Sequence, residues 1–424
     1  MMALVLFLSF LFLMFLGVPI AFSLGISSII YLLINDIGLT IIPSRMFSGI
    51  NSFVLLCIPG FILAGNLMNA GGITERIIKF ANDLLGHIRG GLGLANIGSS
   101  MGFAGISGTA LADTASIGSV MIPAMKKEGY DSSFAAAVTS SSSTIGPIIP
   151  PSLPLIIVGT LASVSIGDLF LAGAVPGVLL GVGLMFMAYL ISVKRNYPKQ
   201  ERKPIAVVGK SFFGAFWAIL MTVIILFGIL GGFFTPTEAS IVAVIYALLI
   251  GLFVYRGLKI SQVPKIILNS MVSTASILML VGFANLFGWI MVSERIPVLV
   301  ADTIMGISEN TIIVILLILL LLLFVGTFME TIAALVILFP VLLPVATQVG
   351  MDPVHFGIVM VLALIIGLST PPVGVCLFVA SSIGKVSIWD TTKALMPFLF
   401  VSLTVLLLVA FIPQITLFLP GLFD

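Results

Sequence analysis

The chain consists largely of apolar runs that are long enough to cross a lipid bilayer as helices. A spanning helix needs about 20 apolar residues, and runs of this length recur from the N-terminus to the C-terminus. Hydrophobic residues make up 60% of the chain, charged residues 8%, and the mean hydropathy is +1.31. This composition excludes an ordinary soluble domain, and the short alternating segments of a membrane β-barrel are absent from the sequence. We therefore predict an all-α polytopic membrane protein.

Two stretches interrupt these runs with small, hydroxyl-bearing and helix-breaking residues. The first extends from Ser107 to Pro151 and the second from Gly326 to Pro372. Proline removes a backbone donor and glycine loosens a helix, so carbonyl and amide groups are freed there. At membrane depth such backbone is tolerated only where it is buried or lines a cavity. Isolated examples are explained by plain kinks or close helix packing, but paired interruptions in two halves point to a transporter's binding site.

A basic linker over residues 194–210 divides the chain into two similar halves. Residues 3–34 are expected to form two short helices around Gly17-Val18-Pro19, and residues 35–52 a loop. Each half is predicted to contain scaffold helices that include one interfacial helix (73–89 and 293–307), a re-entrant hairpin of two half-length helices with a broken helix, and a closing helix. In the first half (1–193) these cover 3–89, 91–163 and 168–193; in the second half (211–424) they cover 211–307, 310–384 and 394–418.

The two halves share polar, glycine and proline residues in the same order. Glu75-Arg76 matches Glu294-Arg295, and Pro150-Pro151 matches Pro371-Pro372. Each half then has five crossings, and an odd number predicts an inverted-topology repeat. With the linker in the cytoplasm, all but two of the 18 Lys and Arg residues are cytoplasmic, as the positive-inside rule requires. The two exceptions are Arg45 and Arg295.

The interrupted segments supply the candidate ligands. Carbonyl groups and half-helix C-termini suit Na⁺, a hard cation that prefers oxygen ligands, and half-helix N-termini suit an anionic substrate. The candidate Na⁺-binding residues are Ser107, Gly108, Thr109, Ser142, Ser143, Gly146, Pro150, Gly326, Thr327, Thr331, Gly367, Ser369 and Thr370. The candidate substrate-binding residues are Asp113, Ser140, Ser141, Thr144, Pro151, Glu330, Pro371 and Pro372.

Asp113 and Glu330 follow the two expected hairpin tips at nearly matching positions. A carboxylate inside a membrane is a functional-site candidate, although a helix N-cap or a water-facing carboxylate explains it equally well. Cys57 and Cys376 stand alone in apolar runs and are interpreted as small buried residues rather than as a disulfide or a metal site. The sequence contains nothing that predicts an enzyme or a nucleic-acid partner.

Several of these motifs resemble one transporter family over essentially the whole chain. Gly17-Val18-Pro19-Ile20-Ala21-Phe22, the Gly-Thr tips, the Ser-rich break ending at Pro150-Pro151, and Gly367 to Pro372 are similar to the large membrane subunit of tripartite ATP-independent periplasmic (TRAP) transporters. The resemblance implies an elevator-type, Na⁺-coupled importer in the bacterial inner membrane. It also implies a periplasmic binding protein that delivers an organic acid, such as a C4-dicarboxylate or a sialic acid, and a separate small four-helix membrane subunit.

Carried over by position, one ion site would lie between residues 107–109 and 140–151, and the other between 326–331 and 367–372, with the substrate between them. Neither cluster contains Lys or Arg, so an anionic substrate would meet amides, hydroxyls and Na⁺. Two alternatives stay open at this point. One is a stand-alone Na⁺ or H⁺ symporter of the same fold, and the other is a membrane scaffold that transports nothing.

Overall fold

The computed structural model describes residues 2–307 and 310–423, and every regular element within them is a helix. The predicted all-α class is therefore confirmed. Among the described residues, seven helices are long and apolar enough to cross a membrane, or eight if one bent pair counts as a single span. The seven are α10 (Ile166–Lys194), α11 (Ile205–Leu230), α12 (Pro236–Leu249, continued by the π-helix η3, Ile250–Val254), α13 (Val263–Ser293, preceded by η4, Ile260–Gln262), α15 (Thr311–Phe328), α16 (Thr331–Gln348) and α19 (Ile388–Phe411).

The N-terminal apolar run forms two helices, α1 (Met2–Phe15) and α2 (Ile20–Ile34), as predicted. The turn between them contains Gly17, whose φ of +80° lies in the left-handed region that glycine adopts without a Cβ clash. With 14 and 15 residues, the two helices are about 21 and 22 Å long. Both are shorter than the roughly 30 Å hydrocarbon core of a bilayer.

The expected loop over residues 35–52 is wrong, because the structure contains a helix, α3 (Ile41–Ile50), within it. This helix makes a 70° bend with the segment that follows, which comprises η1 (Val54–Leu56) and α4 (Cys57–Ala70). The ten residues of α3 pack closely against α13. Helices this short depend on tertiary contacts, so the local sequence gave no sufficient signal.

In both interrupted regions the helices end and restart at the positions that the sequence predicts. The first region contains α6 (Gly91–Ser107), α7 (Ala110–Lys127), α8 (Ser132–Ser142), η2 (Ser143–Ile145) and α9 (Leu153–Ala162). The second contains α15, α16, α17 (Pro353–Gly367) and α18 (Val375–Gly384). The hairpin helices have 17 or 18 residues, about 26 Å, so the expectation of half-length helices is wrong.

The segment after α10 is shorter and better anchored than the predicted linker. Residues 195–204 lack helix, and α11 already begins at Ile205, so Lys210 lies on that helix. The segment packs on the first half: the Gln200 amide donates to the Gly86 carbonyl over 3.0 Å, and Asp131 accepts from Arg195 over 2.8 Å and from Tyr197 over 2.7 Å.

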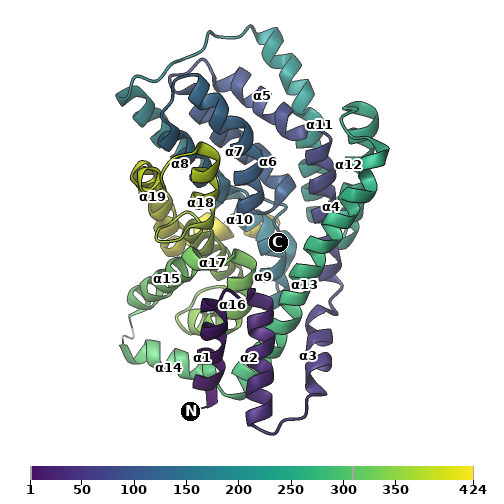
Figure 1. Ribbon diagram of the computed structural model, residues 1–424, viewed down its shortest axis with the longest axis vertical. Coiled ribbons are helices and arrows are strands. Elements are labelled where there is room, and N and C mark those ends of the chain that lie inside the picture. The colour runs from purple at the N-terminus through teal and green to yellow at the C-terminus, as the bar shows by residue number, and fades with distance from the viewer. Residues whose placement is uncertain (1, 308–309, 424) are drawn as a thin grey trace.

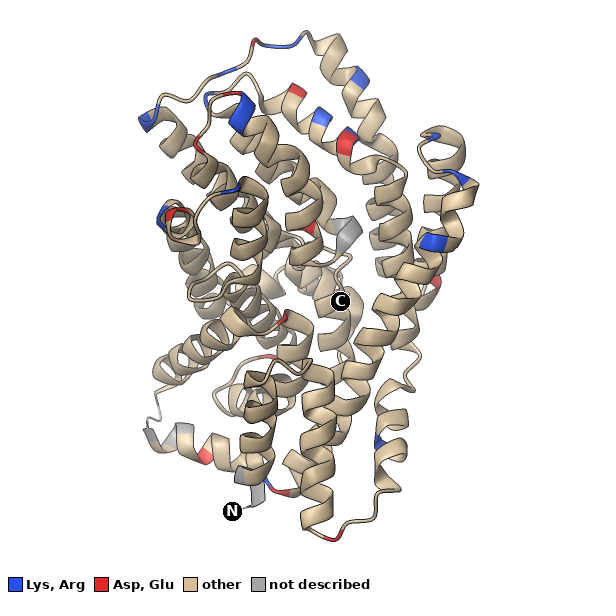
Figure 2. Cartoon of the chain, viewed as in Figure 1, with Lys and Arg blue, Asp and Glu red and all other residues tan. Residues whose placement is uncertain are grey.

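The helices form two groups, which meet where α13 packs against α16. Helices α2, α3 and α4 lie along α13, and α12 packs on α4. In the other group α8 packs against α18 and α19, α15 against α17, and α9 against α16 (Figure 1). Most Lys and Arg residues gather at one end of the molecule, around α5 (Ile73–Leu85), the segment after α10 and the start of α11, whereas α3 and α14 (Ile296–Ile307) lie toward the other end (Figure 2). The expected last span, 394–418, is corrected to α19, which two short helices follow, α20 (Gln414–Leu417) and α21 (Pro420–Phe423).

Candidate functional site

The two helix breaks, far apart in the sequence, meet through a pair of serines. The Ser369 hydroxyl donates to the Ser140 carbonyl over 2.9 Å, and the two hydroxyl oxygens are 3.4 Å apart. Both residues are buried. Each break continues into a Pro-Pro pair, and both Pro-Pro peptide bonds are cis. The Ser-rich end of α8 and the end of α17, which the sequence analysis assigned to two separate ion sites, are therefore in direct contact.

Each hairpin tip lies against the break of its own half. In the second half, the Gly374 amide donates to the Thr327 carbonyl over 3.1 Å, and the backbones of Gly326 and Gly367 are in direct contact, with no room for a Cβ on either. In the first half, a Cβ on Gly146 would collide with the Asp113 carboxylate. Glycine is required at these positions because two backbones, or a backbone and a carboxylate, approach closely.

A cavity of about 100 Å³ lies where the two tips and the two breaks converge. Its wall combines the first tip and the start of α7, the first break with α9, the second tip, and the second break with α18. The lining residues are Gly108, Thr109, Ala110, Leu111, Pro147, Pro154, Glu330, Thr331, Leu368, Val375 and Cys376. This central cavity is lined by four segments that the sequence analysis singled out, and it is large enough for several water molecules.

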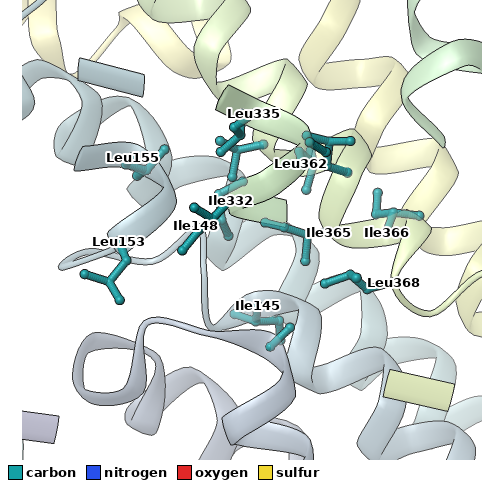
Figure 3. Packing of buried hydrophobic residues seen from close by; sticks show 14 of the residues in the cluster. Ile145, Ile148, Leu153, Leu155, Ile332, Leu335, Leu362, Ile365, Ile366 and Leu368 are labelled. Atoms are coloured by element: carbon teal, nitrogen blue, oxygen red, sulfur yellow. The ribbon is translucent and has the colours of Figure 1, made fainter. Parts of the chain in front are cut away.

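An apolar cluster supports the central cavity from one side. Figure 3 shows Ile148 of the first break beside Ile332 of α16, with Ile365 of α17 and Leu368 of the second break between this pair and Ile145. These side chains are buried. Lipid is as apolar as these residues, so close packing rather than removal from water stabilises such contacts inside a membrane.

Most hydroxyl groups of the first break are already engaged. Ser143 donates to the Thr139 carbonyl over 2.7 Å, and Thr144 donates to the Ser141 carbonyl over 2.6 Å. Ser142 accepts from Ser100 of α6 over 2.9 Å. These hydroxyls reinforce the end of α8 or join it to α6. Their oxygen atoms still have lone pairs that can bind a ligand.

Two buried hydroxyls in the same region have no hydrogen-bond partner among the described residues. They are Ser141 Oγ at the end of α8 and Thr331 Oγ1 at the start of α16. Their side chains are 3% and 2% exposed, respectively. An unsatisfied buried hydroxyl destabilises a fold by about 1–3 kcal/mol, and such groups are rare. Oxygen atoms of this kind suit an alkali cation.

The two carboxylates differ in their surroundings. Glu330 caps α16, and its Oε2 accepts from the amides of Ile332 over 2.9 Å and Ala333 over 3.3 Å. Its remaining surface faces the central cavity. Asp113 is fully buried in the first turn of α7. Glu330 therefore lines the central cavity, whereas the Asp113 carboxylate packs against Gly146 of the first break.

The other predicted ligands lie at the edges of the site. Thr327 and Thr370 donate to carbonyls of their own helices over 2.8 Å. Pro150 and Pro151 are buried, whereas Pro371 is partly exposed and Pro372 is exposed. Ser107 ends α6, but its side chain lies outside the described part of the chain.

Sequence reasoning missed several residues of the site. Asn96 of α6 donates to Thr139 over 2.7 Å and accepts from Ser142 over 3.3 Å. Ser381 of α18 carries a third buried hydroxyl without a partner among the described residues. A buried amide inside an apolar helix, as at Asn96, is itself a signal, because polar side chains in the membrane bond across helices. Cys57 and Cys376 are buried free cysteines, as predicted.

Comparison with known families gives one match over nearly the whole chain. The model of the family described as "Tripartite ATP-independent periplasmic transporter, DctM component" matches residues 7–415. This range includes both hairpin tips and both breaks.

Individual relatives agree with this match, and a solved structure has a similar fold. The chain is 45% identical to the sialic acid TRAP transporter large permease protein SiaM of Vibrio cholerae, with 97% of this chain and 96% of that protein covered. It is 39% identical to the C4-dicarboxylate TRAP transporter large permease protein DctM of Pseudomonas aeruginosa, with 94% of each covered. The fold is similar to the crystal structure of the YdaH transporter of Alcanivorax borkumensis, with a TM-score of 0.63, 15% identity, and 87% of this chain and 86% of that chain covered.

Proposed function

The chain belongs to the DctM component family of tripartite ATP-independent periplasmic transporters and is a multi-pass inner-membrane protein, and from this premise we propose its specific activity. It is the large membrane subunit of an importer that carries a small organic acid into the bacterial cytoplasm, driven by Na⁺. The observation that carries this proposal is the central cavity, because both hairpin tips and both helix breaks converge on it.

The substrate class follows from the relatives and from the chemistry of the site. Relatives of this length are named for sialic acid and for C4-dicarboxylates, and both are carboxylates. Two helices begin at the central cavity, α7 at Ala110 and α16 at Thr331. Helix N-termini attract anions through their free amide groups and their dipole. At α16 the Glu330 carboxylate already accepts from the amides of Ile332 and Ala333, so the acid group of the substrate would bind at the N-terminus of α7.

Coupling to Na⁺ rests on two buried hydroxyls, one on Thr331 in the wall of this cavity and one on Ser141 near the end of α8. Ser141 Oγ and Thr331 Oγ1 would contribute one hydroxyl ligand each, and carbonyls freed by the helix breaks would complete the coordination. A bound cation would satisfy two buried hydroxyls that otherwise have no hydrogen-bond partner among the described residues. Na⁺ is a transported ion in this proposal and not a resident cofactor.

Movement across the membrane is proposed to follow an elevator mechanism with an inverted repeat. The hairpins and broken helices would form the moving unit, and α2, α3, α4, α12 and α13 the scaffold. The extensive packing within each group supports this division. The gathering of Lys and Arg at one end of the molecule supports a cytoplasmic position for that end.

Two partners complete the proposed transporter. A small membrane subunit would cover part of the exposed apolar surface of the scaffold, and a periplasmic binding protein would deliver the acid. A stand-alone symporter of the same fold is the rival. The two are separated by measuring uptake with and without the binding protein: saturable uptake by the membrane subunits alone would favour the rival.

The test of the function is uptake into proteoliposomes that contain this chain and its small subunit. Labelled sialic acid and succinate are offered with the cognate binding protein, with an inward Na⁺ gradient or with equal Na⁺ on both sides. We expect accumulation of one acid only with the gradient. Accumulation driven by a proton gradient alone would refute Na⁺ coupling, and no accumulation under any gradient, with folding verified, would refute transport.

A further inference from the structure

A second and larger cavity, of about 540 Å³, lies between α3 and α13 on one side and α9 and α16 on the other. It shares no lining residue with the central cavity. Arg45 is the one charged side chain among its lining residues, which also include the hydroxyl and amide groups of Ser48, Thr160 and Asn285. Helix α3 lies away from the end where Lys and Arg gather (Figure 2), so this outer cavity would open on the periplasmic side.

The position of Arg45 is fixed by the packing of α3 on α13. A Cβ on Gly49 would lie 2.5 Å from Asn285 Cβ, so only glycine allows this approach of the two helices. Trp289 is one turn beyond Asn285, and the same approach places the Arg45 guanidinium carbon 5.0 Å from the centre of the Trp289 ring. A cation–π contact of this kind holds the side chain without neutralising its charge.

Among residues 2–307 and 310–423, Arg45 has no carboxylate partner. The ion pair in this part of the chain joins two other residues, Arg195 and Asp131. The wall of the outer cavity contains no acidic residue. A guanidinium presents parallel N–H donors that match the two oxygens of a carboxylate. Its side chain is partly shielded from water, which strengthens an interaction with an anion.

We propose that Arg45 is an anion-capture site, which binds the carboxylate of the organic acid in the outer cavity before the acid reaches the central cavity. The site rests on the proposed function, because the acid is the transported substrate. It also supplies a positive charge that residues 107–109, 140–151, 326–331 and 367–372 lack. The volume of the outer cavity accommodates a small organic acid together with water.

A third cavity, which the first hairpin lines, differs from the outer cavity in charge. It has a volume of about 180 Å³ and lies between α4, α13 and the α6–α7 hairpin, with Asn66, Asn69, Ser116 and Ser273 among its lining residues. None of its lining residues is charged. Of these two cavities, the outer cavity offers an acid a fixed cation in its wall, and the other presents neutral amides and hydroxyls.

Trp289 provides a direct readout of binding beside Arg45. The chain has three tryptophans, and Trp217→Phe with Trp389→Phe leaves Trp289 as the only one. The full chain is placed in phosphatidylcholine nanodiscs without Na⁺ and titrated with sialic acid or succinate, whichever the uptake assay identifies. We expect a saturable change in Trp289 emission that weakens as the salt concentration rises.

Four variants test the assignment. Arg45→Gln is expected to weaken binding about tenfold or more, and Arg45→Lys by less, because Lys keeps the charge but loses the paired donors. Asn285→Asp leaves Arg45 intact and is expected to weaken binding similarly by placing a competing carboxylate in the outer cavity. Arg295→Gln, the matched control on the same side of the membrane, is expected to bind like the parent protein.

Several results would overturn the proposal. The proposal is overturned if the transported acid produces no saturable change in Trp289 emission. It is also overturned if Arg45→Gln binds the acid with the same dissociation constant as the parent protein. Phosphatidylglycerol nanodiscs that produce the signal without added acid would identify a lipid headgroup as the ligand instead. Weaker binding of the periplasmic protein with unchanged acid binding would make Arg45 a docking contact.

Uptake separates a failure of this proposal from a failure of the proposed function. In proteoliposomes, Arg45→Gln is expected to raise KM about tenfold and to change kcat less than twofold, because the captured acid is handed on unchanged. Na⁺-driven uptake with parental KM in Arg45→Gln would overturn the capture site and leave the transporter assignment intact. Absence of uptake in the parent protein would overturn both.

Discussion

The contact between Gly326 of α15 and Gly367 of α17 yields a prediction whose magnitude follows from the structure. A Cβ on Gly367 would lie 2.6 Å from Gly326 Cα, and a Cβ on Gly326 would lie 2.6 Å from the Leu364 carbonyl oxygen. Each distance is about 0.8 Å inside the 3.4 Å at which ordinary contact begins. The opposing atoms are backbone atoms, so no rotamer change relieves the overlap, and the two helices must separate.

We expect Gly326→Ala and Gly367→Ala each to destabilise the protein by about 1–2 kcal/mol. Overpacking in a close-packed interior costs about 1–3 kcal/mol, and the higher helix propensity of alanine offsets up to about 1 kcal/mol of this at Gly326. Because either methyl group opens the same gap, the double variant should be destabilised by less than the sum of the two. Na⁺-driven uptake should fall as well, because the second tip is displaced from its break.

The assay is thermal unfolding of the purified protein in nanodiscs, with Gly214→Ala as the control. Gly214 lies in α11, and a Cβ there would meet no atom within 4 Å. We expect the melting temperature of the control to equal or exceed that of the parent protein, and those of the two variants to fall by several degrees. Melting temperatures of Gly326→Ala and Gly367→Ala that match the control would refute the close-packing argument.

Three further outcomes are expected. Ser369→Ala removes the hydrogen bond to the Ser140 carbonyl, so it should lower the free energy of unfolding by about 1 kcal/mol and slow uptake. The control is Ser119→Ala, because the Ser119 hydroxyl bonds only within its own helix. It should change neither stability nor uptake. Thr331→Val keeps the side-chain shape but removes the unsatisfied hydroxyl. The Na⁺ concentration for half-maximal uptake should therefore rise without loss of thermal stability. An unchanged Na⁺ activation curve would contradict this prediction. Burial, followed by its bond to Asp131, raises the pKa of Tyr197 to about 12. The stabilising contribution of this phenol is therefore complete below pH 10 and is lost as the pH rises through about 12, which proteolysis of residues 195–204 at successive pH values would detect; cleavage that begins well below pH 10 would contradict it.

The sequence alone determined the class of the protein and the places where its helices end. Apolar runs in lipid can only form helices or closed barrels, and Gly108 and Pro147 interrupt two of these helices by chain geometry that no packing can restore. Local sequence was insufficient where a helix depends on its neighbour. Helix α3 was taken for a loop because contact with α13, rather than its own ten residues, stabilises it.

Which atom of the site faces which partner was decided only by the tertiary structure. Ser140, Ser141, Ser142 and Ser143 are identical in chemistry and adjacent in sequence, yet they have four different roles. The first joins the second break, the second has no hydrogen-bond partner among the described residues, the third bonds to α6, and the fourth bonds to its own helix. Successive residues of a helix are rotated by about 100°, so the packing of α8 between its neighbours assigns each hydroxyl its direction.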